Sequence, residues 1–188
     1  MTIFEYILVL LSVILGLAVT QLATGVGELI RSRKAVTWSL PYVLWLMFCF
    51  LTILDVWASS WLLRTDARWN LLSVLLVLGI SLAIYLATLW IIPRHIGDEP
   101  IDLGNYMDRE RRYFLGALIA YCLLGIVVNL YLLPTGHFDW ANYYISGPFT
   151  AALLCAWWSP HRWVQLAAPV IGLALLGVYF AVYFPNIG

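Results

Sequence analysis

The sequence predicts an all-α integral membrane bundle of six transmembrane helices in a single domain, residues 1–188. Hydrophobic residues make up 63% of the chain and charged residues only 11%, and the apolar residues gather in six runs. Soluble domains have about 25% charged residues, so this chain lacks the polar surface that water requires. Each run is close to the roughly 20 residues that cross the hydrocarbon core of a bilayer.

The six predicted spans cover residues 3–30, 38–63, 71–92, 113–133, 140–158 and 163–184. Prolines mark several of their ends. Pro41 lies in the first turn of the second span, where a missing N–H costs nothing. Pro93 and Pro134 follow the third and fourth spans, where a helix no longer continues. Because the loops are short, we expect consecutive helices to be antiparallel neighbours.

The first span carries a band of small and polar residues at successive i+4 positions: Ser12, Gly16, Thr20, Thr24 and Glu28. Helices in lipid associate through close backbone approach and interhelical hydrogen bonds, and such bands supply both. The spacing also suits a right-handed crossing of two helices. We therefore predict that this band is the helix-packing seam of the bundle.

The distribution of cations predicts the orientation in the membrane. Only Arg64 and Arg68 follow the second span. The other eight lysines and arginines follow the first, third and fifth spans: Arg31, Arg33, Lys34, Arg94, Arg109, Arg111, Arg112 and Arg162. The positive-inside rule places these three loops in the cytoplasm and both termini outside, N-out and C-out.

The cytoplasmic loop 93–112 is the only sizeable hydrophilic segment. Its first half is acidic and rich in glycine and proline, which is typical of a connector. Its second half resembles a helix start, with Asp102 or Asn105 as the cap. The loop is either a solvated helix start beside the membrane or a docking site for a cytoplasmic protein partner or an anionic lipid.

Several motifs carry a resemblance to known proteins. They are Gly16-Leu-Ala-Val-Thr20, Gly27-Glu-Leu-Ile-Arg31, Asp102-Leu-Gly-Asn-Tyr106 and Arg111-Arg-Tyr113-Phe114. With these motifs the first 135 residues or so resemble a group of bacterial polytopic membrane proteins of about this length, to which no activity is assigned. The resemblance implies a helical fold and a multi-pass location in the bacterial inner (plasma) membrane. It implies no functional residue.

Asp55 is the strongest candidate for a functional residue, because ionisable groups at membrane depth are costly. It lies in the outer half of the second span, with Thr52 and Ser59 on the same helix face. A carboxylate there needs partners or must take up a proton. It is either a structural group, bonded to these hydroxyls and to Asn129 of the fourth span, or a proton- or cation-binding carboxylate.

Other polar residues are expected on the same outer side of the membrane as Asp55. Together with Asp55 they form a predicted outward-facing polar cluster. Its candidate members are Glu5, Tyr6, Asp55, Ser59, Asn129, Tyr131, His137, Asp139, Asn142, Tyr143, Tyr144, Tyr179 and Tyr183. The alternative is that the tyrosines simply sit at the membrane interface, where they are common. Glu5 has a similar alternative, since an acid near a helix N-terminus is favoured by the helix dipole.

The remaining features favour a non-enzymatic protein. The three cysteines and three histidines show no metal or redox spacing, and no motif for a nucleophile, nucleotide or cofactor occurs, so no cofactor is predicted. A net charge of zero argues against a nucleic-acid partner. We predict a membrane binding or assembly module that contacts lipid, copies of itself or a partner protein. The alternative is a small channel or carrier for protons, cations or solutes that uses Asp55.

Overall fold

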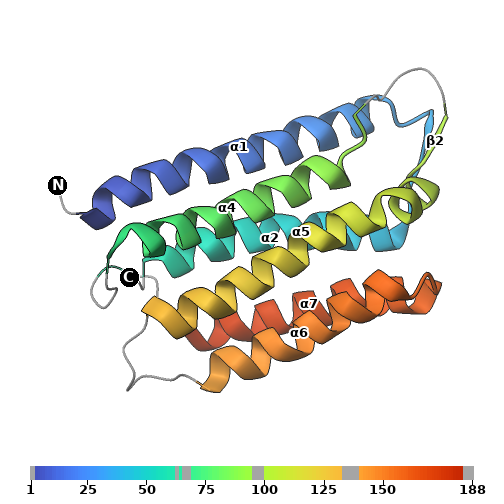
Figure 1. Ribbon diagram of the computed structural model, residues 1–188. Helices are drawn as coiled ribbons and strands as arrows, with labels where there is room; N and C mark the ends of the chain where they lie inside the picture. Colours follow the sequence, from blue (N-terminus) through green and yellow to red (C-terminus); the bar gives the residue numbers. More distant parts are fainter. Residues whose placement is uncertain (1–2, 62–63, 65–68, 95–99, 133–139, 184–188) are drawn as a thin grey trace.

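The computed structural model describes residues 3–61, 64, 69–94, 100–132 and 140–183, without the side chains of residues 3, 132, 140–145, 182 and 183. The described residues form an all-α bundle with one short pair of strands (Figure 1), which confirms the all-α part of the predicted fold class. The elements are α1 (Ile3–Arg31), β1 (Val36–Thr37), α2 (Leu40–Ser60), α4 (Leu71–Ile91), β2 (Ile101–Asp102), α5 (Leu103–Leu132), α6 (Trp140–Trp158) and α7 (Arg162–Tyr183).

Five of these helices, α1, α2, α4, α5 and α7, are long and apolar enough to cross a membrane. The helix α6 has 19 residues, but the side chains of residues 140–145 lie outside the described part of the chain, so the sixth span stays a prediction. Large apolar side chains on the outer surfaces of the helices, such as Val9, Val13 and Leu17, are exposed. Such a surface suits lipid better than water.

The helix α5 begins at Leu103, ten residues before the predicted membrane span 113–133, in the segment where the sequence predicted a helix start. The cause is the cap that the sequence suggested. The side chain of Asp102 accepts hydrogen bonds from the backbone N–H groups of Gly104 at 2.8 Å and Asn105 at 3.1 Å. The second half of the predicted loop 93–112 is therefore the beginning of α5, and the boundaries of the other helices agree with prediction to within three residues.

The helices pack as predicted for short loops, each against the next one along the chain, and further contacts close the bundle. The helix α1 also packs on α4, and α2 also packs on α5 and α7. As a result α2 touches four other helices (Figure 1), while its remaining face, with Met47, Phe50 and Trp57, is exposed. Trp45 and Phe48 of α2 form edge-to-face ring contacts there, and Trp45 meets Phe114 of α5.

A parallel pairing of β1 with β2 ties together two connections at one end of the bundle. Val36 pairs with Ile101, and the N–H of Ile101 donates to the carbonyl of Ala35 at 2.7 Å. The ends of α1, α4 and α6 and the beginnings of α2, α5 and α7 meet at this end (Figure 1). We call it the basic end, because it carries the cationic positions Arg31 to Lys34, Arg94, Arg109 to Arg112 and Arg162.

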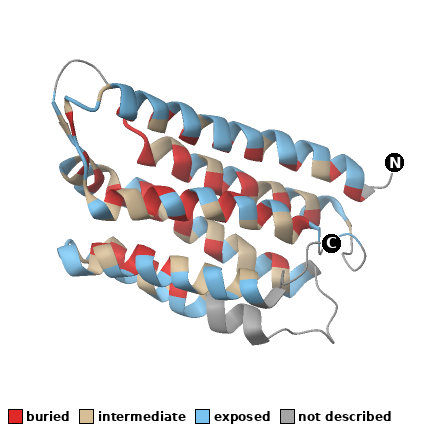
Figure 2. Ribbon diagram, turned by 180° about the vertical axis from the view of Figure 1, so that it is seen from behind, coloured by how far each residue is buried: buried red, intermediate tan, exposed pale blue. Residues whose placement is uncertain are grey.

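The packing face of α1 differs from the predicted seam. Its buried residues are spaced by three or four positions: Phe4, Ile7, Leu11, Leu15, Ala18, Leu22, Gly25 and Leu29. The other side of α1 is exposed along most of its length (Figure 2). This exposed side carries the band of Ser12, Gly16, Thr20, Thr24 and Glu28. The band therefore does not pack the bundle of this chain, because larger aliphatic side chains on the opposite face of α1 make those contacts. A contact of the band with a second molecule stays a prediction.

Candidate functional site

The candidate site is a chain of hydrogen-bonded side chains centred on Asp55, near the end of α2. Its Oδ1 atom accepts a hydrogen bond from the hydroxyl of Ser59 at 3.2 Å. Its Oδ2 atom accepts one from the hydroxyl of Tyr121 in α5, also at 3.2 Å. The Ser59 hydroxyl lies 3.3 Å from the hydroxyl of Tyr179 in α7. Three helices thus contribute to one polar cluster in an otherwise apolar bundle.

Helix geometry and packing explain the arrangement. Asp55 and Ser59 are four residues apart, so they lie on one face of α2, one turn above the other. The helix α2 packs on both α5 and α7, which brings the two tyrosines to that face. Thr52 lies on it too, but its hydroxyl donates to the carbonyl of Phe48 at 2.8 Å and not to Asp55.

The cluster borders a cavity of about 250 Å³ that residues from all six helices line. One water needs only roughly 10–15 Å³ of such space, so the cavity has room for a small organic molecule. Its polar lining includes Asp55, Ser59, Tyr121, Asn129, Ser146 and Tyr179. These residues lie in the halves of their helices that are remote from the basic end. Most of the remaining lining is apolar, with aromatic rings from Phe48 and Phe149.

The charge of Asp55 has no cationic partner in the described part of the chain. The sequence has no lysine or arginine in residues 1–30, 35–63, 69–93, 113–161 or 163–188. The one described ion pair joins Arg109 to Glu110 at the basic end. Among the described residues, only hydroxyl groups contact this half-buried carboxylate, although a charge among apolar side chains is costly unless it is paired.

No family model, curated protein or solved structure matches this chain. What the site can do therefore follows from its own geometry. A carboxylate with two hydroxyl donors inside a cavity can bind a cation or the N–H donors of a solute. The linked hydroxyls of Tyr121, Ser59 and Tyr179 also offer steps for a proton around Asp55.

The structure brings together some of the predicted site residues. Asp55 and Ser59 are bonded, and Asn129 lines the same cavity, although no described hydrogen bond joins it to Asp55. Glu5 is exposed on α1 and is not part of the cavity lining. The hydroxyl of Tyr131 instead accepts from Asn70 at 2.8 Å.

Other members of the predicted cluster cannot be placed. His137 and Asp139 lie outside the described residues, as do the side chains of Asn142, Tyr143, Tyr144 and Tyr183. Tyr6 is described and is exposed on α1. The central part of the cluster, around Asp55, is the part that the structure defines.

Sequence reasoning missed Tyr121, which makes the second hydrogen bond to Asp55. A signal was available. Tyrosines of membrane spans concentrate at the ends, where the ring meets the interface, but Tyr121 lies well inside the apolar run of α5. A tyrosine at that depth needs a partner for its hydroxyl, and Asp55 lies at a matching depth in α2.

The described residues contain no group of three histidine, cysteine, aspartate or glutamate side chains that could hold a metal ion. The cysteines are free, with Cys49 and Cys122 buried and Cys155 exposed. Of these, Cys122 lines the Asp55 cavity. The site is therefore best described as one carboxylate with hydroxyl partners in an apolar setting.

Proposed function

We propose that this protein is a non-enzymatic binding module of the bacterial inner membrane that holds a small cationic solute at Asp55. One observation carries the proposal: the carboxylate lines a cavity of about 250 Å³, and its partners among the described residues are hydroxyl groups only. A cation in that cavity would supply the missing opposite charge. Pockets that bind small molecules are mostly apolar with a few polar groups that fix orientation, and this cavity has that composition.

The proposal includes the arrangement in the membrane. All six helices span the bilayer as one domain, with the basic end in the cytoplasm and both termini outside. The five apolar helices and the concentration of cations at one end support this arrangement. The polar side of the Asp55 cavity then lies in the outer half of the membrane, and a solute reaches it from the outside.

The lining indicates the class of solute. An ammonium group suits the Asp55 carboxylate, since a charge-assisted hydrogen bond is about twice as strong as a neutral one. An apolar or aromatic part of the solute suits Phe48 and Phe149, whose ring centroids lie 4.8 Å apart. Aromatic faces also attract cations. A small amphipathic ammonium ion therefore fits both parts of the cavity.

Equilibrium binding of tritiated 2-phenylethylamine, protonated at pH 7, to the purified full-length protein tests the proposal. We expect saturable binding to the wild type and a loss of about tenfold or more in affinity for Asp55→Asn, because the charge-assisted bond is removed. Glu28→Gln, which removes an exposed acid from α1, is the matched control and should bind as the wild type does. The neutral analogue 2-phenylethanol should compete weakly. Wild-type affinity in Asp55→Asn would refute the proposal.

A second candidate function is transport, as a small channel or carrier for the same solute or for protons. The chain of hydroxyls from Tyr121 through Asp55 and Ser59 to Tyr179 favours it, since it links three helices around the carboxylate. Proton and cation flux into liposomes that contain the protein distinguishes the two functions. Flux that Asp55→Asn abolishes supports transport, whereas binding without flux supports the binding module.

The exposed band on α1 favours a further role in assembly, through self-association or a membrane protein partner. The hydroxyl of Thr20 donates a hydrogen bond to the carbonyl of Gly16 at 2.8 Å. Another helix can therefore approach the band at Thr20 without leaving this hydroxyl unbonded. Energy transfer between labelled copies in liposomes tests it, with Gly16→Leu as the disrupting variant. Val13→Leu, at an exposed position beside the band, is its control. Equal transfer in both variants would contradict assembly through the band.

A further inference from the structure

Arg111 is a buried arginine at the basic end of the bundle. Only 8% of its surface is exposed, whereas its neighbours Arg109 and Arg112 on α5 are exposed. One terminal nitrogen of its guanidinium donates to the carbonyl of Ser159 at 3.3 Å, and its Nε atom has no partner. A guanidinium has five N–H donors, so this one has more donors than the described residues give it acceptors.

No carboxylate of the described residues balances the charge of Arg111. The ion pair at this end is formed by Arg109 and Glu110. Asp108, one turn before Arg111 on α5, is exposed and forms no described ion pair with it. Since a buried charge without a partner is strongly unfavourable, this guanidinium, unpaired among the described residues, favours an anion beside it.

The surroundings of Arg111 favour an anion. The carbonyl of Ser159 is shared, because it also accepts from Nε2 of Gln165 at 2.8 Å. His161 lies two residues after Ser159, whose carbonyl is shared. The next residue, Arg162, begins α7 and adds a second cation. In the first turn of this 22-residue helix the N–H groups of Val164 and Gln165 bond to the carbonyl of His161, whereas those of Arg162 and Trp163 have no described partner. The positive end of the helix dipole also lies there. Helix N-termini with a nearby arginine are suited to phosphate.

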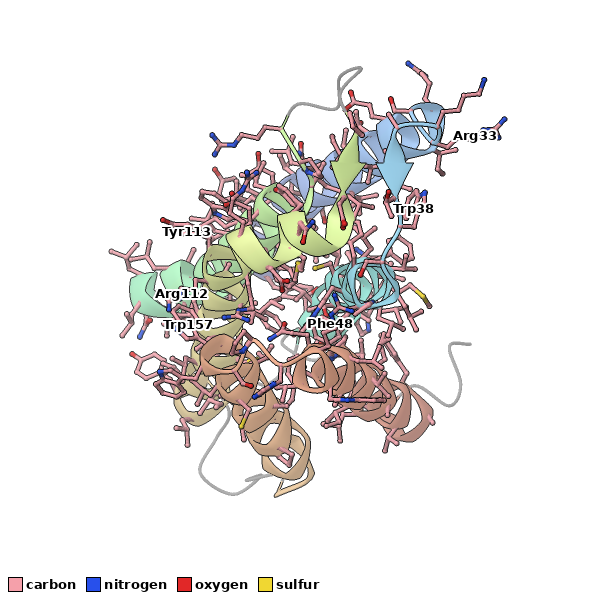
Figure 3. The ribbon with its side chains drawn as sticks, turned by 90° about the vertical axis from the view of Figure 1, so that its right-hand side faces the viewer. Arg33, Trp38, Phe48, Arg112, Tyr113 and Trp157 are labelled. Atoms are coloured by element: carbon pink, nitrogen blue, oxygen red, sulfur yellow. The ribbon has the colours of Figure 1, made fainter. Side chains whose placement is uncertain are left out.

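Exposed tryptophans place the turn between α6 and α7 at the level of lipid headgroups. Trp158 and Trp163 flank it and are 76% and 82% exposed. Tryptophans concentrate where the hydrocarbon meets the headgroups. Trp157 contacts Gly116 of α5, and in the end-on view of Figure 3 it lies on the same flank of the bundle as Arg112 and Tyr113. The anion that reaches this flank is therefore a lipid headgroup.

We propose that Arg111 and the turn between α6 and α7 bind the phosphate of an anionic phospholipid headgroup. The guanidinium donors that Ser159 leaves open contact the phosphate, and Arg162 and the first turn of α7 add positive potential. Binding fixes α5 against the α6–α7 pair, because Arg111 then joins the lipid to Ser159. The inference rests on insertion in the membrane and is independent of the Asp55 cavity.

Native mass spectrometry of the full-length protein in neutral detergent tests the proposal, with phosphatidylglycerol and phosphatidylcholine as the probes. We expect the wild type to retain phosphatidylglycerol about tenfold or more in preference to phosphatidylcholine. Arg111→Gln should lose that preference. Arg112→Gln, which removes the same charge from the adjacent exposed residue, is the matched control and should keep most of it. Arg111→Lys keeps the charge without the planar fork and should retain an intermediate preference.

Equal losses in Arg111→Gln and Arg112→Gln would overturn the proposal, since they would show general attraction to a basic surface. Equal retention of the two lipids by the wild type would overturn it too, even if Arg111→Gln failed to fold. Millimolar inorganic phosphate distinguishes a lipid from a soluble anion. If it displaces phosphatidylglycerol from the wild type, the site binds free phosphate and the lipid assignment is wrong.

Discussion

The hydroxyl of Tyr121 donates a hydrogen bond to Oδ2 of Asp55 across 3.2 Å, although the two residues are 66 positions apart in the sequence. This bond joins α2 to α5 in the interior of the bundle. It also gives the carboxylate one of its two described donors. The stability of the bundle and the chemistry of the cavity therefore share this contact.

Tyr121→Phe should lower the free energy of unfolding by about 1.5–3 kcal/mol, the range for hydrogen bonds to charged groups. Tyr113→Phe is the control, because Tyr113 is exposed and contacts Trp90 through its ring. The control should change stability by less than about 0.5 kcal/mol. Unfolding of the purified protein by increasing SDS measures both. Equal changes in the two variants would mean that the bond to Asp55 contributes nothing.

Gly25→Ala should destabilise the protein, and Gly27→Ala should not. A Cβ atom at Gly25 would collide with the side chain of Ile92, whereas one at Gly27 would meet nothing within 4 Å. Ile92 is branched at Cβ and cannot easily turn away. We expect a loss of about 1–3 kcal/mol for the first variant and a gain of up to about 1 kcal/mol for the second, since alanine favours a helix. The same SDS titration measures the difference, and a stable Gly25→Ala variant would contradict the packing of α1 on α4.

Tyr42→Phe should loosen the end of α4. The buried hydroxyl of Tyr42 donates to the carbonyl of Ile91 at 2.9 Å, and this carbonyl is in the last turn of α4, where helix carbonyls lack partners. Its loss should cost about 1–3 kcal/mol. Hydrogen exchange should become faster at the end of α4. Tyr6→Phe, at an exposed position on α1, should leave the exchange unchanged. Unaltered exchange in Tyr42→Phe would contradict this role.

The basic end should face the cytoplasm. The pairing of Val36 with Ile101 holds the α1–α2 and α4–α5 connections together, so they must lie on one side of the membrane. Reporter fusions after Lys34 and after Gly104 should therefore both report a cytoplasmic location. A periplasmic signal from both would reverse the orientation. Opposite signals would contradict the fold itself.

The helices were predictable from the sequence because the bilayer limits their length and composition. The apolar runs and the prolines at their ends place most boundaries within three residues, and Asp102 was available as the cap of α5. The predicted membrane span begins ten residues after the start of α5, since hydropathy locates the hydrocarbon core and not the end of a helix. Residues 103–112 are polar and nevertheless helical.

Which face of each helix packs inward was not predictable in the same way. The band from Ser12 to Glu28 fits a packing motif, but α1 packs with Leu11, Leu15 and Leu22 instead. Small residues and large aliphatic residues can both form helix contacts in lipid, so the pattern of one helix does not decide between them. Asp55 and Ser59 were found because they share one helix face, whereas Tyr121 required knowledge of which helices meet.

The location of a bound ammonium group tests the central claim most directly. Crystals of the protein with 4-bromophenethylammonium would show the bromine by its anomalous scattering and the ligand by its density. We expect the nitrogen about 2.7–3.2 Å from a carboxylate oxygen of Asp55, with the bromine in the part of the cavity that Phe48 and Phe149 line. An ammonium group bound elsewhere, or a cavity that stays without ligand at saturating concentration, would contradict the assignment of Asp55 as the binding residue.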